Sequence, residues 1–486
     1  MLTNARKDTA AGVCAGIALL ALVLLIAVRD SGLPKCREMR GNRGEPAAPA
    51  KEKEGMKEHI GGVATGLAAV AAAVSVVTAD VAVAADAVPV EKQRAFLRAP
   101  DGTGNYGATK LPTEWSEKDG KNIKWKTAIP LKGWSSPVVW GDMVVVTGAD
   151  KDKRAIYGID AATGKIAWTC EPTKNDKAAN DYSTSTMDAR WDELCYAGST
   201  PATDGKKAIA LFSNGQLVAA DLATGKEIWQ VVVGQPGGNQ YGQCSAVLIH
   251  KNNAIICFEG DEQFLAAYSL DDGTRKWSAK RKGSTWASPV LAKSGDKTFA
   301  ITAADPQVLV VDADSGAVAW SKELITEGVE YAYGPNPLVV GDMLVVSGER
   351  CGLIGVKLAT GEKVWSYGKT GNVDKFSDGT SLTTDGKHVF HYFKSFLTCV
   401  DAKDGKQVKE KDMGEDAAYA APFVADAKIY LATTGGGALV CKADPAADFE
   451  TVGKGSVKDA CDAIATIAGG CIYMRGDSTL YCIGAK

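Results

Sequence analysis

The fold is decided by one stretch of the sequence, Trp134-Ser-Ser-Pro-Val-Val-Trp-Gly-Asp-Met-Val-Val-Val146, which runs on to Asp160-Ala-Ala-Thr-Gly-Lys-Ile-Ala-Trp168. It indicates short β-strands separated by turns. Its ending, Asp-x-x-x-Gly-x-x-x-Trp, returns closely at Asp221, Gly225 and Trp229, and more loosely at Gly273 and Trp277, at Asp312, Gly316 and Trp320, and at Gly361 and Trp365. An internal repeat of this kind decides the architecture before any single residue does.

The repeat ending has a direct physical interpretation. An aspartate such as Asp160 can accept hydrogen bonds from backbone amides across the turn, and Gly164 can adopt the positive φ that closes the turn. Trp168 then supplies a large apolar face to bury between neighbouring sheets, and its indole N–H needs a polar partner. Each repeat therefore predicts a four-stranded antiparallel unit that packs against the next one.

The spacing of the repeats predicts the number of these units. After Trp229 the tryptophans follow at intervals of 48, 43 and 45 residues, and three weaker repeats lead to Lys486, where the last one stops before an outer strand. Residues 122–128 have the pattern of an outer strand without inner partners, so they can complete the last blade and close the ring, which removes open sheet edges. We predict an all-β, eight-bladed β-propeller over residues 122–486, with four-stranded antiparallel blades; seven blades is the alternative count.

Two apolar segments precede the repeats. Residues 13–28 have the length of a signal-peptide core or of a short membrane anchor. Residues 60–79 follow Met56 and lead to an Ala-x-Ala cleavage motif that ends at Ala84. Either segment is typical of a chain that is exported from the cytoplasm.

Two hypotheses account for the tandem segments. Translation could start at Met56, so that 56–85 form a signal peptide or apolar leader and 1–55 are not part of the protein. Alternatively, residues 13–28 are a genuine membrane anchor followed by a linker. Both hypotheses place the propeller, with its lead-in at 86–121, in the periplasm or at the cell surface of a bacterium.

The charge and the cysteine content indicate which classes of partner to expect and in which compartment the protein lies. The formal net charge is -3, and no Lys/Arg cluster is interleaved with aromatic residues, so nucleic acid is not expected as a partner. Ten of the 12 cysteines lie at Cys170 or beyond, an even number that fits disulfides in an oxidising compartment. Cys170 and Cys195 flank a polar insertion and could form a disulfide across it, and Cys461 and Cys471 lie within one repeat. The alternative is that these cysteines are buried thiols.

The repeat ending resembles the tryptophan-docking motif of the pyrroloquinoline-quinone (PQQ) type propellers, and the resemblance covers residues 97–486. The segments 98–104 and 133–137 look like the openings of secreted bacterial PQQ-like repeat proteins. The implied fold is also similar to the propeller lipoprotein of the outer-membrane barrel-assembly machinery. The resemblance implies the eight-bladed fold, and it does not imply that PQQ is bound.

The same resemblance sets an expectation about cofactors. Dehydrogenases of this superfamily use a vicinal disulfide, a carboxylate base and a calcium ion, whereas this sequence has no adjacent cysteines and no recognisable calcium-ligand set. His388 and His391 would point to opposite faces of a strand, so they do not predict a metal site. We expect no cofactor and no metal; PQQ with calcium belongs to a dehydrogenase alternative.

The candidate binding residues are aromatic and lie just before the inner strands. Trp134, Trp286 and Tyr419 each precede a repeat proline by three residues, and three tyrosines lie near the equivalent point of other repeats, namely Tyr196, Tyr241 and Tyr333. A ring of such side chains at the mouth of the propeller could stack on a sugar, a quinone or a peptide. The alternative is that they fill space between blades. The insertion at 170–196 lies at the same rim and is either functional or a variable loop.

We therefore expect an exported, non-catalytic and monomeric propeller that binds a protein or a glycan in the cell envelope. One alternative is a PQQ-dependent alcohol or sugar dehydrogenase. The other is a scaffold for the assembly of outer-membrane proteins.

Overall fold

The computed structural model divides the chain into two units, Met1–Ala85 and Asp86–Lys486. It describes 88–98, 100–178, 194–237, 242–260, 262–325, 334–348, 351–368 and 380–485, all in the second unit. The anchor at 13–28, the leader at 56–85 and the start at Met56 lie outside these residues and stay predictions. Among the described residues, no helix has the length and apolar character needed to cross a membrane.

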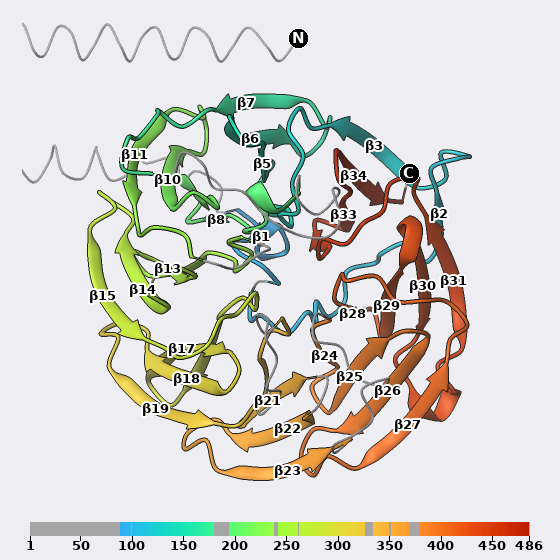
Figure 1. Ribbon diagram of the computed structural model, residues 1–486. Helices are drawn as coiled ribbons and strands as arrows, with labels where there is room; N and C mark the ends of the chain where they lie inside the picture. Colours follow the sequence, from blue (N-terminus) through green and yellow to red (C-terminus); the bar gives the residue numbers. More distant parts are fainter. Residues whose placement is uncertain are drawn as a thin grey trace, which may run out of the picture. The chain divides into compact units, whose positions relative to one another are not determined.

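Eight antiparallel blades stand around a ring (Figure 1), which confirms the predicted fold and the higher blade count. Their strands are, for blade 1, β4 (Val138–Trp140), β5 (Met143–Ala149), β6 (Arg154–Asp160) and β7 (Ile166–Cys170); for blade 2, β8 (Ala202–Thr203), β9 (Lys207–Leu211), β10 (Gln216–Asp221) and β11 (Glu227–Val232); for blade 3, β12 (Leu248–His250), β13 (Asn253–Phe258), β14 (Phe264–Ser269) and β15 (Arg275–Lys280); and for blade 4, β16 (Val290–Ser294), β17 (Lys297–Ala303), β18 (Gln307–Asp312) and β19 (Val318–Glu323).

The second half of the ring repeats this order. Its strands are, for blade 5, β20 (Leu338–Val340), β21 (Met343–Gly348), β22 (Gly352–Lys357) and β23 (Lys363–Tyr367); for blade 6, β24 (Thr383–Thr384), β25 (His388–Phe393), β26 (Phe396–Asp401) and β27 (Gln407–Asp412); for blade 7, β28 (Phe423–Ala425), β29 (Lys428–Thr433), β30 (Gly437–Lys442) and β31 (Thr451–Ser456); and for blade 8, β32 (Thr466–Ala468), β33 (Cys471–Arg475), β34 (Thr479–Gly484) and β3 (Ile123–Ala128). The described helices are single 3₁₀ turns, namely η1 (Val90–Lys92), η2 (Cys195–Ala197), η3 (Thr434–Gly436) and η4 (Pro445–Ala447).

The ring is closed by the N-terminal strand of the propeller. β3 pairs antiparallel with β34 and becomes the outer strand of blade 8, so that Trp125 lies opposite Cys482. The first and last parts of the propeller therefore share one sheet, as the sequence predicted. Opening the ring at this point would require breaking the β3–β34 ladder.

The repeat ending joins each blade to the next through its tryptophan. The Asp160 carboxylate accepts hydrogen bonds from the Thr163 backbone N–H and hydroxyl, both at 2.7 Å, and Gly164 closes the turn at φ 73°. The indole of Trp125 in the preceding blade lies on this glycine, where a Cβ would come within 2.6 Å of the ring. Gly164 is thus required for its backbone conformation and for the close approach of the indole.

Among the described residues, six tryptophans make this contact, and we call them the docking tryptophans. Each indole N–H donates to a backbone carbonyl of the following blade, and each ring lies on a positive-φ glycine of that blade. The hydrogen bonds run from Trp125 to Ala161 (2.9 Å), Trp168 to Leu222 (2.9 Å), Trp229 to Leu270 (2.9 Å), Trp277 to Ala313 (3.3 Å), Trp320 to Leu358 (2.8 Å) and Trp365 to Ala402 (3.0 Å), and the glycines are Gly164, Gly225, Gly273, Gly316, Gly361 and Gly405.

Two junctions between blades are built differently. In blade 6 the docking position holds Lys409, whose Nζ lies 2.5 Å from a carboxylate oxygen of Asp448 in blade 7, beside the fully buried Phe449. Between blades 7 and 8 the apolar core contains Trp115. This residue belongs to β2 (Trp115–Ser116), which pairs parallel with β31, and its indole lies on Gly455. The lead-in therefore supplies an indole that the repeat of blade 7 has lost.

The lead-in also crosses one end of the ring, which we call the turn end because it carries the hairpins between the first and second strands of the blades. β1 (Gln93–Arg94) pairs with β4, and the carbonyls of Glu91, Lys92 and Gly107 accept hydrogen bonds from the turns of blades 8, 1 and 7 at 2.7–3.0 Å. The Arg94 guanidinium donates to the Ile467 carbonyl at 2.7 Å. The segment is visible as the blue trace in the middle of Figure 1.

Candidate functional site

The end of the ring opposite the lead-in, which we call the rim face, carries the loops that enter the inner strands. These loops are tied together by hydrogen bonds that run from blade to blade through one equivalent position of the repeat. At this position a backbone N–H donates to a side-chain oxygen in the next blade, from Ser136 to Thr200 (3.0 Å), Ala246 to Ser288 (2.9 Å), Ser288 to Asn336 (2.7 Å) and Asn336 to Ser381 (3.0 Å). This series of hydrogen bonds explains why a small polar residue precedes the proline of the repeat. It also fixes the rim loops relative to one another.

Two of the predicted rim aromatics meet. The rings of Trp134 and Tyr419 are 6.1 Å apart in an edge-to-face arrangement, although they come from blades 1 and 7. The Trp134 backbone N–H donates to the Ala197 carbonyl at 3.0 Å, and the Tyr419 backbone N–H donates to the Asp462 carboxylate at 3.3 Å. We call these two residues the rim pair. Because Tyr419 is 51% exposed, the pair presents a large apolar surface on an anchored backbone.

Of the other predicted aromatics, the structure describes Tyr196 and Trp286, and neither contacts the rings of the rim pair. Tyr196 is half-buried and packs against the core between blades 1 and 2. Trp286 is half-buried in blade 4, between Thr285 and Ala287, which are joined by a hydrogen bond of 3.0 Å. Tyr241, Tyr333 and residues 179–193 of the insertion lie outside the described residues, so their roles stay predictions.

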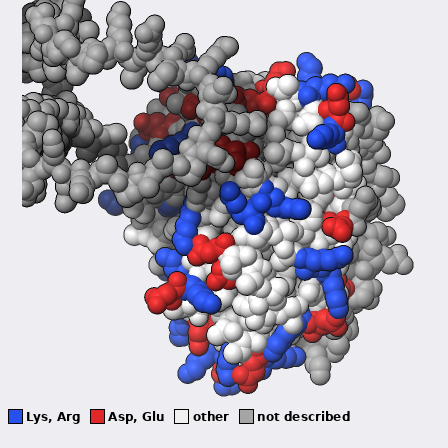
Figure 2. All heavy atoms as spheres, turned by 90° about the vertical axis from the view of Figure 1, so that its left-hand side faces the viewer, with Lys and Arg blue, Asp and Glu red and all other residues white. Residues whose placement is uncertain are grey.

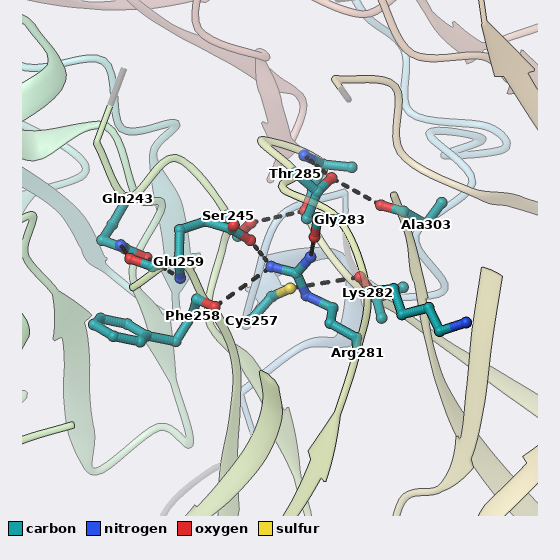
Figure 3. A network of polar contacts seen from close by, with 12 residues as sticks. Gln243, Ser245, Cys257, Phe258, Glu259, Arg281, Lys282, Gly283, Thr285 and Ala303 are labelled. Atoms are coloured by element: carbon teal, nitrogen blue, oxygen red, sulfur yellow. Dashed lines mark hydrogen bonds and ion pairs between the residues drawn. The ribbon is translucent and has the colours of Figure 1, made fainter. Parts of the chain in front are cut away.

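A buried ion pair lies at the rim side of blade 3 (Figure 3). The Glu259 carboxylate, at the end of β13, pairs with the Arg281 guanidinium, which follows β15, and both side chains are almost fully buried. Arg281 also donates to the carbonyls of Phe258 and Gly283. The Gln243 amide holds the Glu259 backbone from both sides, accepting from its N–H at 3.1 Å and donating to its carbonyl.

The sequence gives no indication of this pair. Glu259 directly follows the apolar run 254–258, and its partner lies 22 residues further on, with no spacing rule to connect them. The pair ties the entry loop of blade 3 to the ends of two of its strands. Because the two charges compensate one another away from water, we assign the pair to the buried interior of the rim and not to a binding site.

The two histidines of blade 6 have different surroundings. The Nδ1 of His388 lies 2.8 Å from the Asp385 carboxylate. His391 is completely buried, and burial lowers the pKa of its imidazole to about 4. The imidazole of His391 is therefore uncharged in the folded protein at neutral pH.

Acidification is expected to destabilise the propeller through His391. Between pH 6.5 and pH 4 the unfolded chain binds a proton at this residue and the folded chain does not, so stability falls as the pH is lowered. The expected loss from this residue is about 2 kcal/mol between pH 7 and pH 5. Urea unfolding of the wild type and of His391→Gln at both pH values measures it. Equal losses in the two proteins would show that another group dominates.

The structure changes the expectations about cysteine pairing. Burial raises the pKa of the Cys170 thiol to about 11, and the Cys170–Cys195 disulfide stays a prediction. Cys461 packs in the core between blades 7 and 8, whereas Cys471 packs in the core between blades 8 and 1. Blade 8 separates these two residues, which makes a bond between them incompatible with this fold.

A calcium ion held by carboxylates would need several acidic side chains to converge. Within the parts of the chain that the structure describes, no three His, Cys, Asp or Glu side chains converge in a way that could hold a metal ion. The buried carboxylate of Glu259 is neutralised by Arg281 and is not presented to a ligand. We therefore derive no step of quinone chemistry for these residues.

The lateral surface of the ring is mixed in charge. Figure 2 shows the side that carries β11, β15 and β19, where basic and acidic side chains are interspersed over the visible surface. No continuous basic patch of the kind that binds nucleic acid is visible among the described residues on this side.

Residues 85–284 and 261–445 match the family model described as outer membrane protein assembly factor BamB. A protein of that name from Yersinia pestis is 22% identical over 261 residues, which cover 51% of this chain and 64% of the relative. The dehydrogenase subunit of a quinone alcohol dehydrogenase from Gluconacetobacter polyoxogenes is 25% identical over 371 residues, which cover 65% of this chain and 47% of the relative. The matches thus span less than two thirds of the length of either relative.

Solved structures of both kinds share the fold. BamB from Moraxella catarrhalis superposes with a TM-score of 0.55 at 16% identity, over 74% of this chain and 98% of that chain. A europium-containing methanol dehydrogenase superposes with a TM-score of 0.58 at 13% identity, over 79% and 90% of the two chains. At such low identities these likenesses show the fold alone.

Proposed function

Because the chain belongs to the family described as outer membrane protein assembly factor BamB, we propose that it is an exported, non-catalytic propeller that binds a protein partner in the bacterial cell envelope. Its location is the periplasm or the cell surface. In its finer form the proposal is that this partner takes part in the assembly of outer-membrane proteins, as the names of the relatives suggest.

The rim pair is the single observation that carries the proposal. Trp134 and Tyr419 are large amphipathic side chains of the type that is enriched at protein interfaces, and Tyr419 is half-exposed. Both have backbones fixed by hydrogen bonds, so little conformational entropy is lost when a partner covers them. The lead-in covers the turn end, which favours the rim face for binding.

Site-specific photocrosslinking in the bacterium tests this proposal. With the photoreactive residue p-benzoylphenylalanine in place of Tyr419, we expect a discrete protease-sensitive adduct in the envelope fraction. The matched control is the same residue in place of Val318, which is 56% exposed on the outer strand β19 and should give no such adduct. Addition of Trp134→Ala should reduce the Tyr419 adduct several-fold. A protease-resistant adduct would point to a glycan, and no adduct would reject the rim as the binding surface.

The dehydrogenase alternative has support in the similarity to quinone alcohol dehydrogenases. It is tested by reconstitution of the purified protein with PQQ and calcium, followed by a dye-linked assay with primary alcohols and aldose sugars. We expect no quinone absorbance in the protein fraction and no dye reduction above the protein-free control. Turnover that depends on both additions would replace the proposal made above.

A further inference from the structure

Blade 8 contains two cysteines that lie side by side in the sheet. In the β33–β34 ladder Cys471 lies opposite Gly484, and Cys482 lies opposite Tyr473, so the two cysteines are diagonal neighbours on one face. Both pack in the core between blades 8 and 1. Gly484 makes room for the pair, since a Cβ at this glycine would lie 2.9 Å from the Cys471 sulfur.

A lysine from the strand that closes the ring accompanies this pair. Lys124 is exposed on β3, and its Nζ lies 3.3 Å from the same Cβ position at Gly484 that lies 2.9 Å from the Cys471 sulfur. A nearby ammonium group stabilises a thiolate, which is the reactive form of cysteine. Consistent with this arrangement, the neighbouring Cys482 thiol and the Lys124 ammonium lower the pKa of Cys471 to about 6, whereas the pKa of Cys482 is raised.

We propose that Cys471 and Cys482 form an oxidation site, at which a small-molecule disulfide or a thiol–disulfide oxidoreductase converts the two thiols into a disulfide within blade 8. The inference does not depend on the proposed binding function. It assigns to Lys124 the role of a positioning residue that keeps Cys471 ionised. Cys471 is 5% exposed and Lys124 lies close by, so a local movement at this edge of blade 8 precedes the attack on the oxidant.

The reaction has two steps, both of them thiol–disulfide exchange. The Cys471 thiolate attacks one sulfur of the oxidant's disulfide, and the other sulfur leaves as a thiolate. Cys482 then attacks the Cys471 sulfur and expels the second thiolate of the oxidant, which takes up the proton that Cys482 loses. The two cysteines lose two protons and two electrons, and one disulfide of the oxidant is reduced to two thiols.

Peptide mapping of the folded full-length chain tests the pairing. The chain is incubated with oxidised glutathione at pH 7, its remaining thiols are alkylated, and it is digested with trypsin. We expect the peptide 459–475 to become linked to the peptide 476–486, and we expect the link to persist in Cys461→Ser, since Cys461 shares the first peptide. A link lost in Cys461→Ser, or glutathione carried on Cys471 without any link, would overturn the proposal.

The rate of the reaction tests the role of Lys124. In Lys124→Met we expect oxidation to be about fivefold slower at pH 7 and to approach the wild-type rate at pH 9, because both proteins are then ionised at Cys471. The matched control is Lys126→Met on the same strand, whose ammonium pairs with Glu117 and which should leave the rate unchanged. An unchanged rate in Lys124→Met at pH 7 would remove the lysine from the site.

Discussion

Replacement of Trp320 by Ala is expected to lower the free energy of unfolding by about 3–5 kcal/mol, the range for removing a buried aromatic side chain. Trp320 is 8% exposed and fills the junction between blades 4 and 5. The change removes the ring that lies on Gly361 and leaves the Leu358 carbonyl without its donor, which is 2.8 Å away in the wild type. Urea unfolding followed by circular dichroism measures the loss.

The chain offers a matched control at the equivalent position of blade 6. Lys409 replaces the docking tryptophan there, and its ion pair with Asp448 is partly exposed to solvent. Partly exposed ion pairs contribute little, so Lys409→Ala should cost no more than about 1 kcal/mol. Similar losses in Trp320→Ala and Lys409→Ala would contradict the docking role assigned to the indole.

Much of this architecture can be predicted from the repeat, because the turn and the docking residue of each blade lie close together in the sequence. The turn formed by Asp160 and Gly164, and the interval between tryptophans, are local properties of the sequence. Trp125 was missed as a docking residue because it lies five residues after Gly120 and not four. Its interval of 43 residues before Trp168 carried the same information.

The contacts of the lead-in could not be predicted in the same way. Asp426 in blade 7 accepts hydrogen bonds from the backbone N–H groups of Thr109, Lys110 and Leu111, at 2.6–2.9 Å. This arrangement depends on two segments more than 300 residues apart in the sequence, and no periodicity links them. The same holds for Trp115, which reaches the junction between blades 7 and 8 through the path of the lead-in.

The rim lies between these two cases. The sequence places an aromatic residue before each of several inner strands, but it does not say which of them turn toward one another. Trp134 and Tyr419 meet because their loops come from blades 1 and 7, which flank blade 8. Tyr196 obeys the same sequence rule and packs inward. Loop conformation, which the repeat does not encode, decides between the two outcomes.

Removal of one member of the buried ion pair is expected to destabilise the propeller as much as the loss of a docking tryptophan. In Glu259→Ala the Arg281 guanidinium stays buried without its counter-charge, a situation that costs about 3–5 kcal/mol. The carbonyls of Phe258 and Gly283 remain as partners of the guanidinium, but they carry no net charge to compensate it. The loss is measured by urea unfolding at pH 7, where the wild-type pair is intact.

A double variant separates the cost of an unpaired charge from the value of the pair itself. Glu259→Leu combined with Arg281→Met replaces both charges by apolar side chains of similar size, and such replacements of buried pairs are often neutral or stabilising. We expect the free energy of unfolding of the double variant to lie within about 1 kcal/mol of the wild-type value and well above that of Glu259→Ala. If instead the double variant is as unstable as the single one, the pair itself stabilises the rim of blade 3, and Gln243 and its neighbours depend on the charges for their positions.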